Sequence, residues 1–323
     1  MQEGVAQHSR AEMQVVLVDP SPVIQGAFTR LLKSQGHATQ AFSSSLAALE
    51  TIRADPAVDA LICSAELSPI SGVELCWEVR LIAGDRRPLY ILFTSSNCDE
   101  KLVVEALDCG ADDFISKPPR PQEFYAKLRV ADRMMTLQRE LIRLAVTDPL
   151  TGIYNRRAFF EQATEACQRA EQNGPLSAIL FDIDHFKDIN DLYGHAVGDE
   201  AIRAIAVGAQ RNYPLVGRLG GDEFSVLLSG QSLAGAVAAA EALRSSFAEV
   251  QLRTEGGDAR LTCSFGVSEW QPGDSPDDLM RGADLALYRA KSEGRDRVGT
   301  PPADSWLQQT PPQTKSIARS IPR

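Results

Sequence analysis

The sequence has no long apolar segment. No uninterrupted hydrophobic run approaches the roughly 18 residues that a membrane-spanning helix needs. Residues 1–13 are polar and unlike a secretory signal peptide, and we expect them to be flexible. We therefore expect a soluble, cytoplasmic protein that does not insert into a membrane.

Paired cysteines and an excess of positive charge are also missing. The six cysteines form no C-x-x-C pair, which favours reduced thiols over a disulfide framework or a zinc site. The net charge of -10 argues against a broad nucleic-acid-binding surface, although it allows a local basic pocket for one nucleotide. We expect no nucleic-acid partner.

What the chain does have is enough length and apolar content for two domains. Its 323 residues are 44% hydrophobic and 24% charged, which is typical of soluble globular proteins. After the N-terminal segment we expect a first domain over 14–120, a helical connector over 121–146, a second domain over 147–299 and a disordered, proline-rich tail over 300–323.

The first domain alternates short apolar runs with amphipathic stretches. Strand-like runs at 15–18, 60–63, 89–93 and 113–116 are separated by helical patterns, which predicts a parallel α/β sheet covered on both faces. In such sheets the functional edge lies at the carboxyl ends of the strands. The polar residues that the sequence places there are Asp19, Ser64, Thr94 and Lys117.

This layout resembles a response-regulator receiver domain, over roughly 14–135. The resemblance rests on LVDPSP after the first strand, on Gly72, and on GADDFISKP at 110–118. It implies a (βα)5 fold. Receivers hold Mg²⁺ with an acidic pair and accept phosphate on an aspartate, but here Pro20 replaces the second acid and Ser64 the acceptor. We therefore expect a pseudo-receiver that serves dimerisation or binds an unidentified protein partner.

The polar residues that remain in this pocket have structural explanations. Asp19 is expected to cap the first helix, Thr94 to satisfy loop backbone, and Lys117 to form an ion pair with Asp19. Glu66 lies near the acceptor position, but its register points elsewhere. The Lys117–Pro118 bond is a candidate for a cis peptide.

The connector is predicted to be a continuous helix, because it is rich in helix formers and has no glycine or internal proline. Its apolar residues are spaced by 4, 3, 4 and 3, as on the a/d seam of a parallel coiled coil: Val130, Met134, Leu137, Leu141 and Leu144. The pattern covers only about two heptads, so packing of the seam against the protein's own domains is an equal alternative.

The second domain contains two concentrations of acidic residues. The strand-like run 177–183 leads into Asp182 and Asp184, and a buried acid is costly unless a cation lies against it. The sequence RLGGDEFSVLL at 218–228 reads as a hairpin with two glycines and two acids at its turn. Glycines admit a phosphate close to the backbone and carboxylates suit a divalent metal, but ordinary turn chemistry explains this stretch equally well by itself.

Five blocks of the second domain resemble the diguanylate cyclase, or GGDEF, family across roughly 148–298. The resemblance implies an α+β domain with a polymerase-palm-like βααββαβ core. It also implies the condensation of two GTP into cyclic di-GMP with release of two pyrophosphates, in a homodimer where each half-site holds one GTP. The blocks are DPLTGIYNRRAFF (148–160), LSAILFDIDHFKDIND (176–191), YGHAVGDE (193–200), the GGDEF hairpin (218–228) and LALYRAKSEGRDRV (285–298).

The resemblance assigns the metal and catalytic roles. Mg²⁺ or Mn²⁺, two per active site, would be held by Asp182, the carbonyl of Ile183, Asp222 and Glu223. The metals would neutralise phosphate charge and orient the attacking 3′-hydroxyl. Asp182, Asp222 and Glu223 are then the catalytic residues, with Glu223 also assisting deprotonation of that hydroxyl.

The resemblance also assigns the substrate contacts. Asn190 and Asp199 would bind the guanine edge, and Asp199 would select guanine over adenine by accepting from the base N1–H and amine. Lys291 and Arg295 share one helix face if the helix continues that far; a solvated basic face is the alternative. The residues expected at the phosphates and ribose are Lys187, Gly220, Gly221, Lys291 and Arg295.

One inhibitory motif of the family is broken here. Many members carry R-x-x-D ahead of the hairpin, where it binds product; in this chain Pro214 replaces the acid, while Arg211 and Arg218 remain. Proline cannot accept the guanine hydrogen bonds, so weak or absent product inhibition is expected through this site. The alternative to an enzyme is a non-catalytic GTP- or cyclic di-GMP-binding signalling module, which the intact catalytic residues disfavour.

Overall fold

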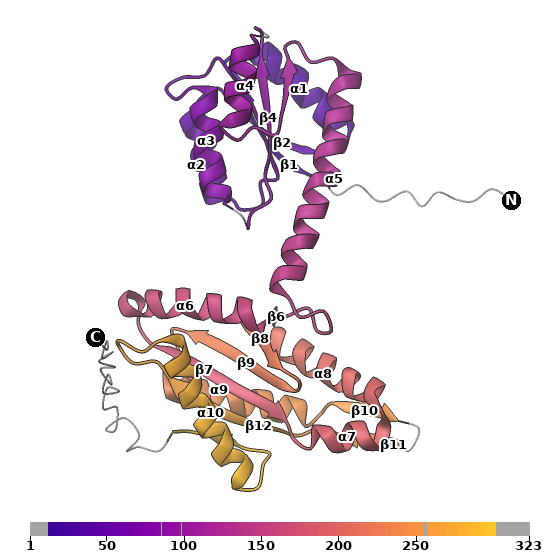
Figure 1. Cartoon of the computed structure of the whole chain (residues 1–323), viewed down its shortest axis with the longest axis vertical. Coiled ribbons are helices and arrows are strands. Elements are labelled where there is room, and N and C mark those ends of the chain that lie inside the picture. The colour runs from indigo at the N-terminus through magenta and orange to yellow at the C-terminus, as the bar shows by residue number, and fades with distance from the viewer. Residues whose placement is uncertain (1–11, 85, 98, 255–256, 302–323) are drawn as a thin grey trace, which may run out of the picture. The chain divides into compact units, whose positions relative to one another are not determined.

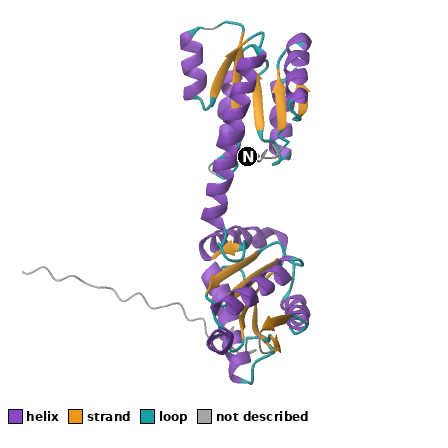
Figure 2. Ribbon diagram, turned by 90° about the vertical axis from the view of Figure 1, so that its right-hand side faces the viewer, coloured by secondary structure: helices purple, strands orange, loops and turns teal. Residues whose placement is uncertain are grey.

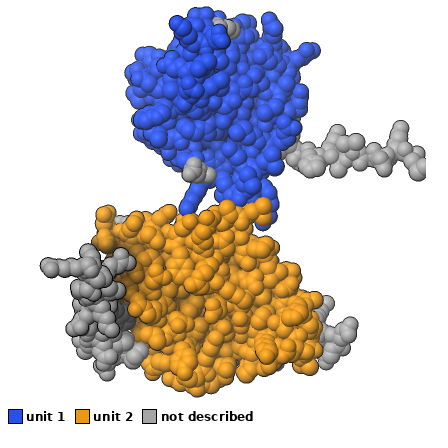
Figure 3. Space-filling view, in the orientation of Figure 1, with its two compact units in different colours: residues 1–143 blue, residues 144–323 orange. Residues whose placement is uncertain are grey.

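The computed structural model divides the chain into two compact units between Arg143 and Leu144 (Figure 3). Each unit has a main sheet flanked by helices (Figure 2). In the described part of the chain, no helix is both long and apolar enough to cross a membrane. The described residues are 12–84, 86–97, 99–254 and 257–301.

The first unit contains a five-stranded parallel sheet with strand order β2-β1-β3-β4-β5, which confirms the predicted receiver-type fold. The strand β2 was not among the runs predicted, because this edge strand is only partly buried and mixes polar with apolar residues. The elements are β1 (Gln14–Val18), α1 (Pro22–Ser34), β2 (Ala38–Phe42), α2 (Ser45–Ala54), β3 (Ala60–Ser64), α3 (Gly72–Ala83), β4 (Tyr90–Ser95), α4 (Glu100–Asp108), β5 (Asp113–Ser116) and α5 (Pro121–Val146).

Both faces of this sheet are buried, which is why its strands read as continuous apolar runs. Val16 and Val18 of β1 pack with residues of α2 and α3 on one face. Val15 and Leu17 pack with residues of α1 and α5 on the other. The polar groups at the carboxyl ends of the strands therefore lie at the edge of a sheet that has a hydrophobic core on each face.

Helix α5 runs over the residues of the expected connector and has two apolar faces. Phe124, Leu128, Ala131 and Met135 are buried in the core of the first unit. The seam residues are exposed, from 38% for Met134 to 66% for Leu141. The seam residues are therefore not part of the core of the first unit.

The second unit is built on a six-stranded sheet with order β13-β12-β7-β9-β8-β6 (Figure 1). Its central succession β7-α7-α8-β8-β9-α9-β12 is the expected βααββαβ core, and β10 and β11 form a separate pair. The elements are β6 (Tyr154–Asn155), α6 (Arg156–Asn173), β7 (Leu176–Ile183), α7 (Phe186–Tyr193), α8 (His195–Gln210), β8 (Val216–Gly220), β9 (Glu223–Ser229), α9 (Leu233–Phe247), β10 (Gln251–Thr254), β11 (Gly257–Arg260), β12 (Cys263–Glu269), α10 (Pro276–Ser292) and β13 (Val298–Gly299).

The central strand β7 is buried along its whole length. Because side chains alternate along a strand, Ile179 and Phe181 pack with residues of α8 and α9, while Ala178 and Leu180 pack with residues of α6 and α10. Antiparallel neighbours β9 and β12 pair with its two edges. The two cores hold the carboxyl end of β7, where Asp182 lies, in a fixed place.

Candidate active site

The carboxyl end of β7 meets the turn between β8 and β9. The antiparallel register places Asp182 directly opposite Glu223, and Asp222 is the preceding residue in the two-residue turn. Asp182 is buried, whereas Asp222 is partly exposed and Glu223 is exposed. The structure thus brings together all three carboxylates that the sequence predicts as catalytic.

The charge balance at this point is unfavourable for carboxylates. Burial, together with the nearby Asp222 and Glu223 carboxylates, raises the pKa of Asp182 to about 6 against the opposing effect of Lys291. The Lys291 ammonium lies 2.8 Å from Asp182 Oδ2. One ammonium does not offset the burial and the like charges, so the site favours an additional cation.

The donor set fits a divalent cation by its chemistry. Carboxylate and carbonyl oxygens are the ligands that Mg²⁺ and Mn²⁺ prefer, and Asp182, Ile183, Asp222 and Glu223 offer them at one strand end. Within the residues that the structure describes, however, no group of three His, Cys, Asp or Glu side chains is arranged as a metal site. An oxygen of Asp182 is bonded to Lys291, which would have to release it.

The glycine turn has free space beside Gly221 and is held by hydrogen bonds from Arg218. A Cβ atom on Gly221 would meet nothing within 4 Å. The guanidinium of Arg218 donates twice to the carbonyl oxygen of Gly221, at 2.9 and 2.7 Å, and lies 3.0 Å from Asp148 Oδ1. Arg218, expected as a remnant of the inhibitory site, therefore supports the turn, and the sequence carried no local signal for its pairing with Asp148.

Asp184 is satisfied by hydrogen bonds and not by a cation. Ser264 Oγ donates to its Oδ1 at 2.7 Å, and Thr262 Oγ1 donates to its Oδ2 at 2.9 Å. A third donor, the backbone N–H of Asp296, lies 3.1 Å from Oδ2. The two acids of this strand end thus have different environments.

The residues predicted to read guanine lie on neighbouring helices, α7 and α8. Gly198 packs so closely that an added Cβ would lie 2.0 Å from Asn190 Oδ1, which explains a glycine inside a helix. Asp199 follows Gly198 directly, and its side chain is 49% exposed, with Arg203 4.0 Å away. The Asp199 carboxylate predicted to select guanine is thus half-exposed.

The predicted phosphate residues come from three segments. Lys187 is exposed on α7, and Lys291 extends from α10 to Asp182. Lys291 and Arg295 were expected to share a helix face only if the helix continued to Arg295. It does not, because α10 ends at Ser292 and the chain then takes positive φ values of 117° at Gly294 and 63° at Arg295.

The former inhibitory motif lies at the end of α8. Arg211 is the C-terminal cap residue of this helix, and both Arg211 and Pro214 are exposed. Arg218, in contrast, contacts the glycine turn. The three residues expected at the inhibitory site therefore lie in two different environments.

In the first unit, the predicted ion pair between Lys117 and Asp19 is present. Lys117 Nζ lies 2.7 Å from Asp19 Oδ2, and the lysine side chain is only 5% exposed. The helix-cap prediction for Asp19 is wrong: Ser21 is the N-cap of α1, and Asp19 Oδ1 accepts from the Ser21 N–H at 2.8 Å. Thr94 Oγ1 donates to the Cys63 carbonyl at 3.2 Å, and the Lys117–Pro118 peptide is cis.

Glu66 is part of the same pocket, so the expectation that its register points elsewhere is wrong. Strand β3 ends at Ser64, and the chain then turns, which ends the alternation of side chains. Glu66 Oε2 accepts from Lys117 Nζ at 2.6 Å and from Ser64 Oγ at 2.8 Å. Burial alone would raise the pKa of Glu66, but hydrogen bonds from Lys117, Ser64 and Ser96 lower it to about 2.

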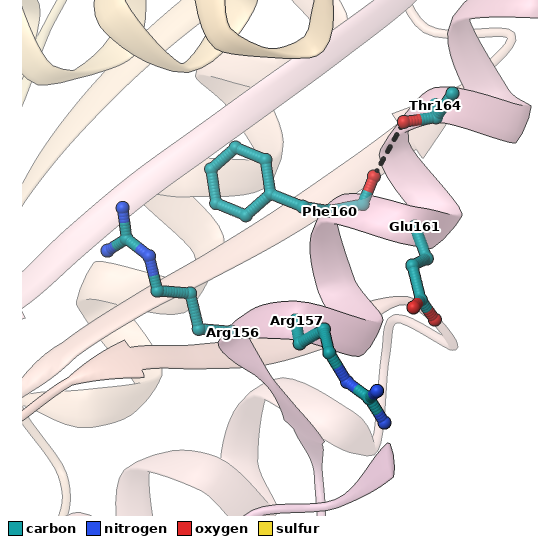
Figure 4. A pocket seen from close by; sticks show the side chains of 5 residues that line it. All are labelled: Arg156, Arg157, Phe160, Glu161 and Thr164. Atoms are coloured by element: carbon teal, nitrogen blue, oxygen red, sulfur yellow. Dashed lines mark hydrogen bonds between the residues drawn. The ribbon is translucent and has the colours of Figure 1, made fainter. Parts of the chain in front are cut away.

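A hollow on α6 lies outside this chemistry (Figure 4). It is lined by Arg156, Arg157, Phe160, Glu161 and Thr164. The guanidinium carbon of Arg156 lies 5.4 Å from the centre of the Phe160 ring, a cation–π contact. The hollow contains none of the catalytic carboxylates, and the candidate active site is the strand end at Asp182.

Comparison with known proteins links this geometry to a family. The family model described as "Diguanylate cyclase, GGDEF domain" matches residues 145–297, and the model for the response regulator receiver domain matches residues 15–129. The response regulator PleD of Caulobacter vibrioides is 35% identical over 261 residues, which cover 76% of this chain and 57% of PleD. The chain thus spans little more than half of that relative.

Two further relatives match over more of their own length. The crystal structure of the coiled coil and GGDEF domain of DgcB from Caulobacter crescentus, in complex with c-di-GMP, has a TM-score of 0.51 and 31% identity, over 55% of this chain and 97% of that one. The diguanylate cyclase DgcM of Escherichia coli K12 is 32% identical over 289 residues, which cover 82% of this chain and 69% of DgcM. By these matches the chain belongs to the GGDEF diguanylate cyclase family, with a receiver domain preceding the GGDEF domain.

Proposed function

We propose that the second unit is a diguanylate cyclase that condenses two GTP into cyclic di-GMP and releases two pyrophosphates. The observation that carries the proposal is the carboxylate cluster at the end of β7. There a buried Asp182 with a pKa raised to about 6 lies opposite Glu223, beside the open glycine turn. Such a site favours a cation and leaves room for a nucleotide phosphate against the backbone.

The metal would be held by Asp182, the Ile183 carbonyl, Asp222 and Glu223, as two Mg²⁺ or Mn²⁺ per site. When bound, these ions neutralise charge on the phosphates and on the attacking 3′-hydroxyl. Glu223, which is exposed at the first position of β9, would accept the proton of that hydroxyl. Asp182 is ionised for these roles above pH 6, where its carboxylate becomes the dominant form.

Lys291 has a second role in this proposal. Its ammonium lies 2.8 Å from Asp182 and offsets part of the negative charge there, and its side chain is 32% exposed. Because the Lys291 side chain is partly exposed, it could reorient toward the β- and γ-phosphates of GTP without leaving a buried site. Lys187 and Arg295, both exposed, would complete the phosphate contacts, and Gly220 and Gly221 would lie against the nucleotide.

Guanine recognition is assigned to the α7–α8 pair. Gly198, near the start of α8, packs closely against the Asn190 side chain. Asp199 is the residue directly after Gly198. Asp199 would accept from the guanine N1–H and amine, which adenine does not offer as a pair. Its half-exposed carboxylate would be covered by the bound base.

The reaction needs two half-sites, which a homodimer would supply. The a/d seam on α5 supports this proposal, because its five apolar residues are 38% to 66% exposed and lie away from the buried face of the helix. Pairing the seam with a second copy would cover these five apolar residues and bring two GGDEF domains together.

The receiver would then act without phosphotransfer, through dimerisation or an unidentified protein partner. Ser64 cannot form an acyl phosphate, and Lys117 is already bonded to Asp19 and Glu66. We expect acetyl phosphate to leave both activity and oligomeric state unchanged; a change that depends on Ser64 would contradict this proposal.

Product inhibition through the former R-x-x-D site would be weak. Pro214 offers no side-chain acceptor for guanine, and Arg218 is bonded to Asp148 and Gly221. Strong inhibition by low micromolar cyclic di-GMP that disappears in Arg211→Ala would contradict this.

The experiment that tests the proposed activity combines binding with product identification. The full chain is incubated with GTP and Mg²⁺, nucleotide binding is measured by calorimetry, and products are identified by mass spectrometry. We expect GTP binding and cyclic di-GMP, with no product from Asp222→Ala. Tight GTP binding with only unreacted GTP recovered from the unaltered chain would instead identify a non-catalytic binding module.

A further inference from the structure

A buried carboxylate two residues beyond Asp182 has no assignment in the proposed reaction. Asp184 is 5% exposed, and both of its oxygens accept hydrogen bonds from hydroxyls, those of Ser264 and Thr262. Its backbone N–H also donates to the carbonyl oxygen of Thr262, at 2.9 Å. This aspartate is therefore locked to the beginning of β12.

The remaining donor comes from a distant segment of the chain, residues 293–297, which joins α10 to β13. The backbone N–H of Asp296 donates to Asp184 Oδ2 at 3.1 Å. The Asp296 carboxylate in turn accepts from Arg244 at 2.9 Å, and the carbonyl oxygen of Arg297 accepts from the Phe265 N–H at 2.9 Å. The segment is thus tied to β7, α9 and β12.

The backbone of this segment is strained. Arg295 and Asp296 have φ values of 63° and 44°, in the left-handed region that side chains with a Cβ rarely adopt. Two consecutive residues persist there only when the surroundings hold them. The Asp184 carboxylate accepts the backbone N–H of Asp296, the second of these two residues. A hydrogen bond to a charged group is stronger than one to a neutral group.

We propose that Asp184 is a positioning residue for substrate phosphate. By accepting the Asp296 N–H, it holds the left-handed segment, which carries the exposed Arg295, against the end of β7. This inference rests on the proposed function, from which it takes the contact between Arg295 and the phosphates of GTP. Asp184 has the role of holding this backbone, with three donors on its two oxygens, and is not assigned as a metal ligand.

The first test is hydrogen exchange of residues 293–299 in the full chain without nucleotide. Asp184→Ala is expected to raise exchange at the Asp296 amide about tenfold or more, because its charged acceptor is lost. Asp184→Asn, which keeps one oxygen acceptor, is expected to raise it less. The matched control is Asp188→Ala, because Asp188 is 76% exposed and contacts the His185 ring; it should change nothing.

The second test is steady-state kinetics with GTP. Asp184→Ala should raise the KM for GTP on the order of tenfold, through misplacement of Arg295, and leave the Mg²⁺ concentration for half-maximal activity unchanged. Asp184→Asn should recover part of the loss. If Asp184→Ala does not fold, Ser264→Ala and Asp184→Asn are expected to show the same two effects in weaker form.

The outcomes separate the two proposals. Unchanged exchange in 293–299 after removal of the Asp184 carboxylate would overturn the positioning role. A shifted Mg²⁺ requirement with normal exchange would overturn it as well, because Asp184 would then be a metal ligand. If the unaltered chain neither binds nor converts GTP, the proposed function fails, and the phosphate-positioning role fails with it; faster exchange would then establish only a structural link between Asp184 and the segment.

Discussion

Replacing Asp182 by asparagine is expected to stabilise the second unit at pH 8 while abolishing catalysis. Burial, with Asp222 and Glu223 nearby, raises the pKa of Asp182 from its ordinary value of 3.8 to about 6 despite Lys291. The folded state therefore binds this proton more tightly than the unfolded chain does. The stability contributed by the protonated form is complete below pH 3.8 and is lost as the pH rises through about 6.

The size of the effect follows from the pKa difference. A shift of about 2 units corresponds to about 3 kcal/mol of free energy of unfolding lost above pH 6. Asparagine carries no such penalty, and the pKa of about 6 already includes the attraction of Lys291, so we expect a net gain of about 1 to 3 kcal/mol at pH 8. For a unit of this size, each kcal/mol corresponds to about 2 to 4 °C in Tm.

Differential scanning calorimetry of the full chain measures this effect. The transition of the second unit should rise in Asp182→Asn at pH 8, and the difference from the unaltered protein should shrink as the pH approaches 4. Asp188→Asn, an exposed aspartate of α7, should not shift it. A lower Tm for Asp182→Asn at pH 8 would contradict this prediction, because the stabilisation from the ion pair with Lys291 would then exceed the cost of burying the Asp182 carboxylate.

Three further predictions concern other parts of the chain. Asp199→Asn should reduce the preference for GTP over ATP roughly 10- to 100-fold, measured as the ratio of kcat/KM values; an unchanged ratio would refute base reading by this carboxylate. Glu66→Gln should destabilise the first unit at pH 7 by at most about 1 kcal/mol, since Glu66 is partly exposed, and calorimetry should show the difference narrowing as the pH falls from 4.5 toward 2. Leu137→Glu with Leu141→Glu should weaken self-association at least about tenfold in sedimentation equilibrium; an unaltered dimer would exclude the seam.

The strands and the turn of the candidate site could be predicted because their signals are local. The apolar run at 177–183 and the glycine–acid pairs of the hairpin each lie within a few residues of one another. Helix α5 likewise follows from unbroken helix-forming composition. The edge strand β2 escaped prediction because an edge position tolerates polar residues and blurs the apolar run.

The interactions that complete the site could not be predicted in the same way, because they join residues far apart in the chain. Arg218 and Asp148 are 70 residues apart, and Asp184 and the Asp296 amide are 112 apart. Such pairs depend on how helices pack on the sheet and leave no local pattern. The end of α10 is different: Gly294 directly after its basic last turn is a helix-stop signal that could have been used.

The most direct test of the central claim is the stoichiometry of the reaction. Cyclic di-GMP and pyrophosphate are quantified in the same reaction of the full chain with GTP and Mg²⁺ at pH 8. We expect two pyrophosphates for each cyclic di-GMP, and neither product from Asp222→Ala. Release of GDP and phosphate, or no turnover by a folded chain that binds GTP, would contradict it.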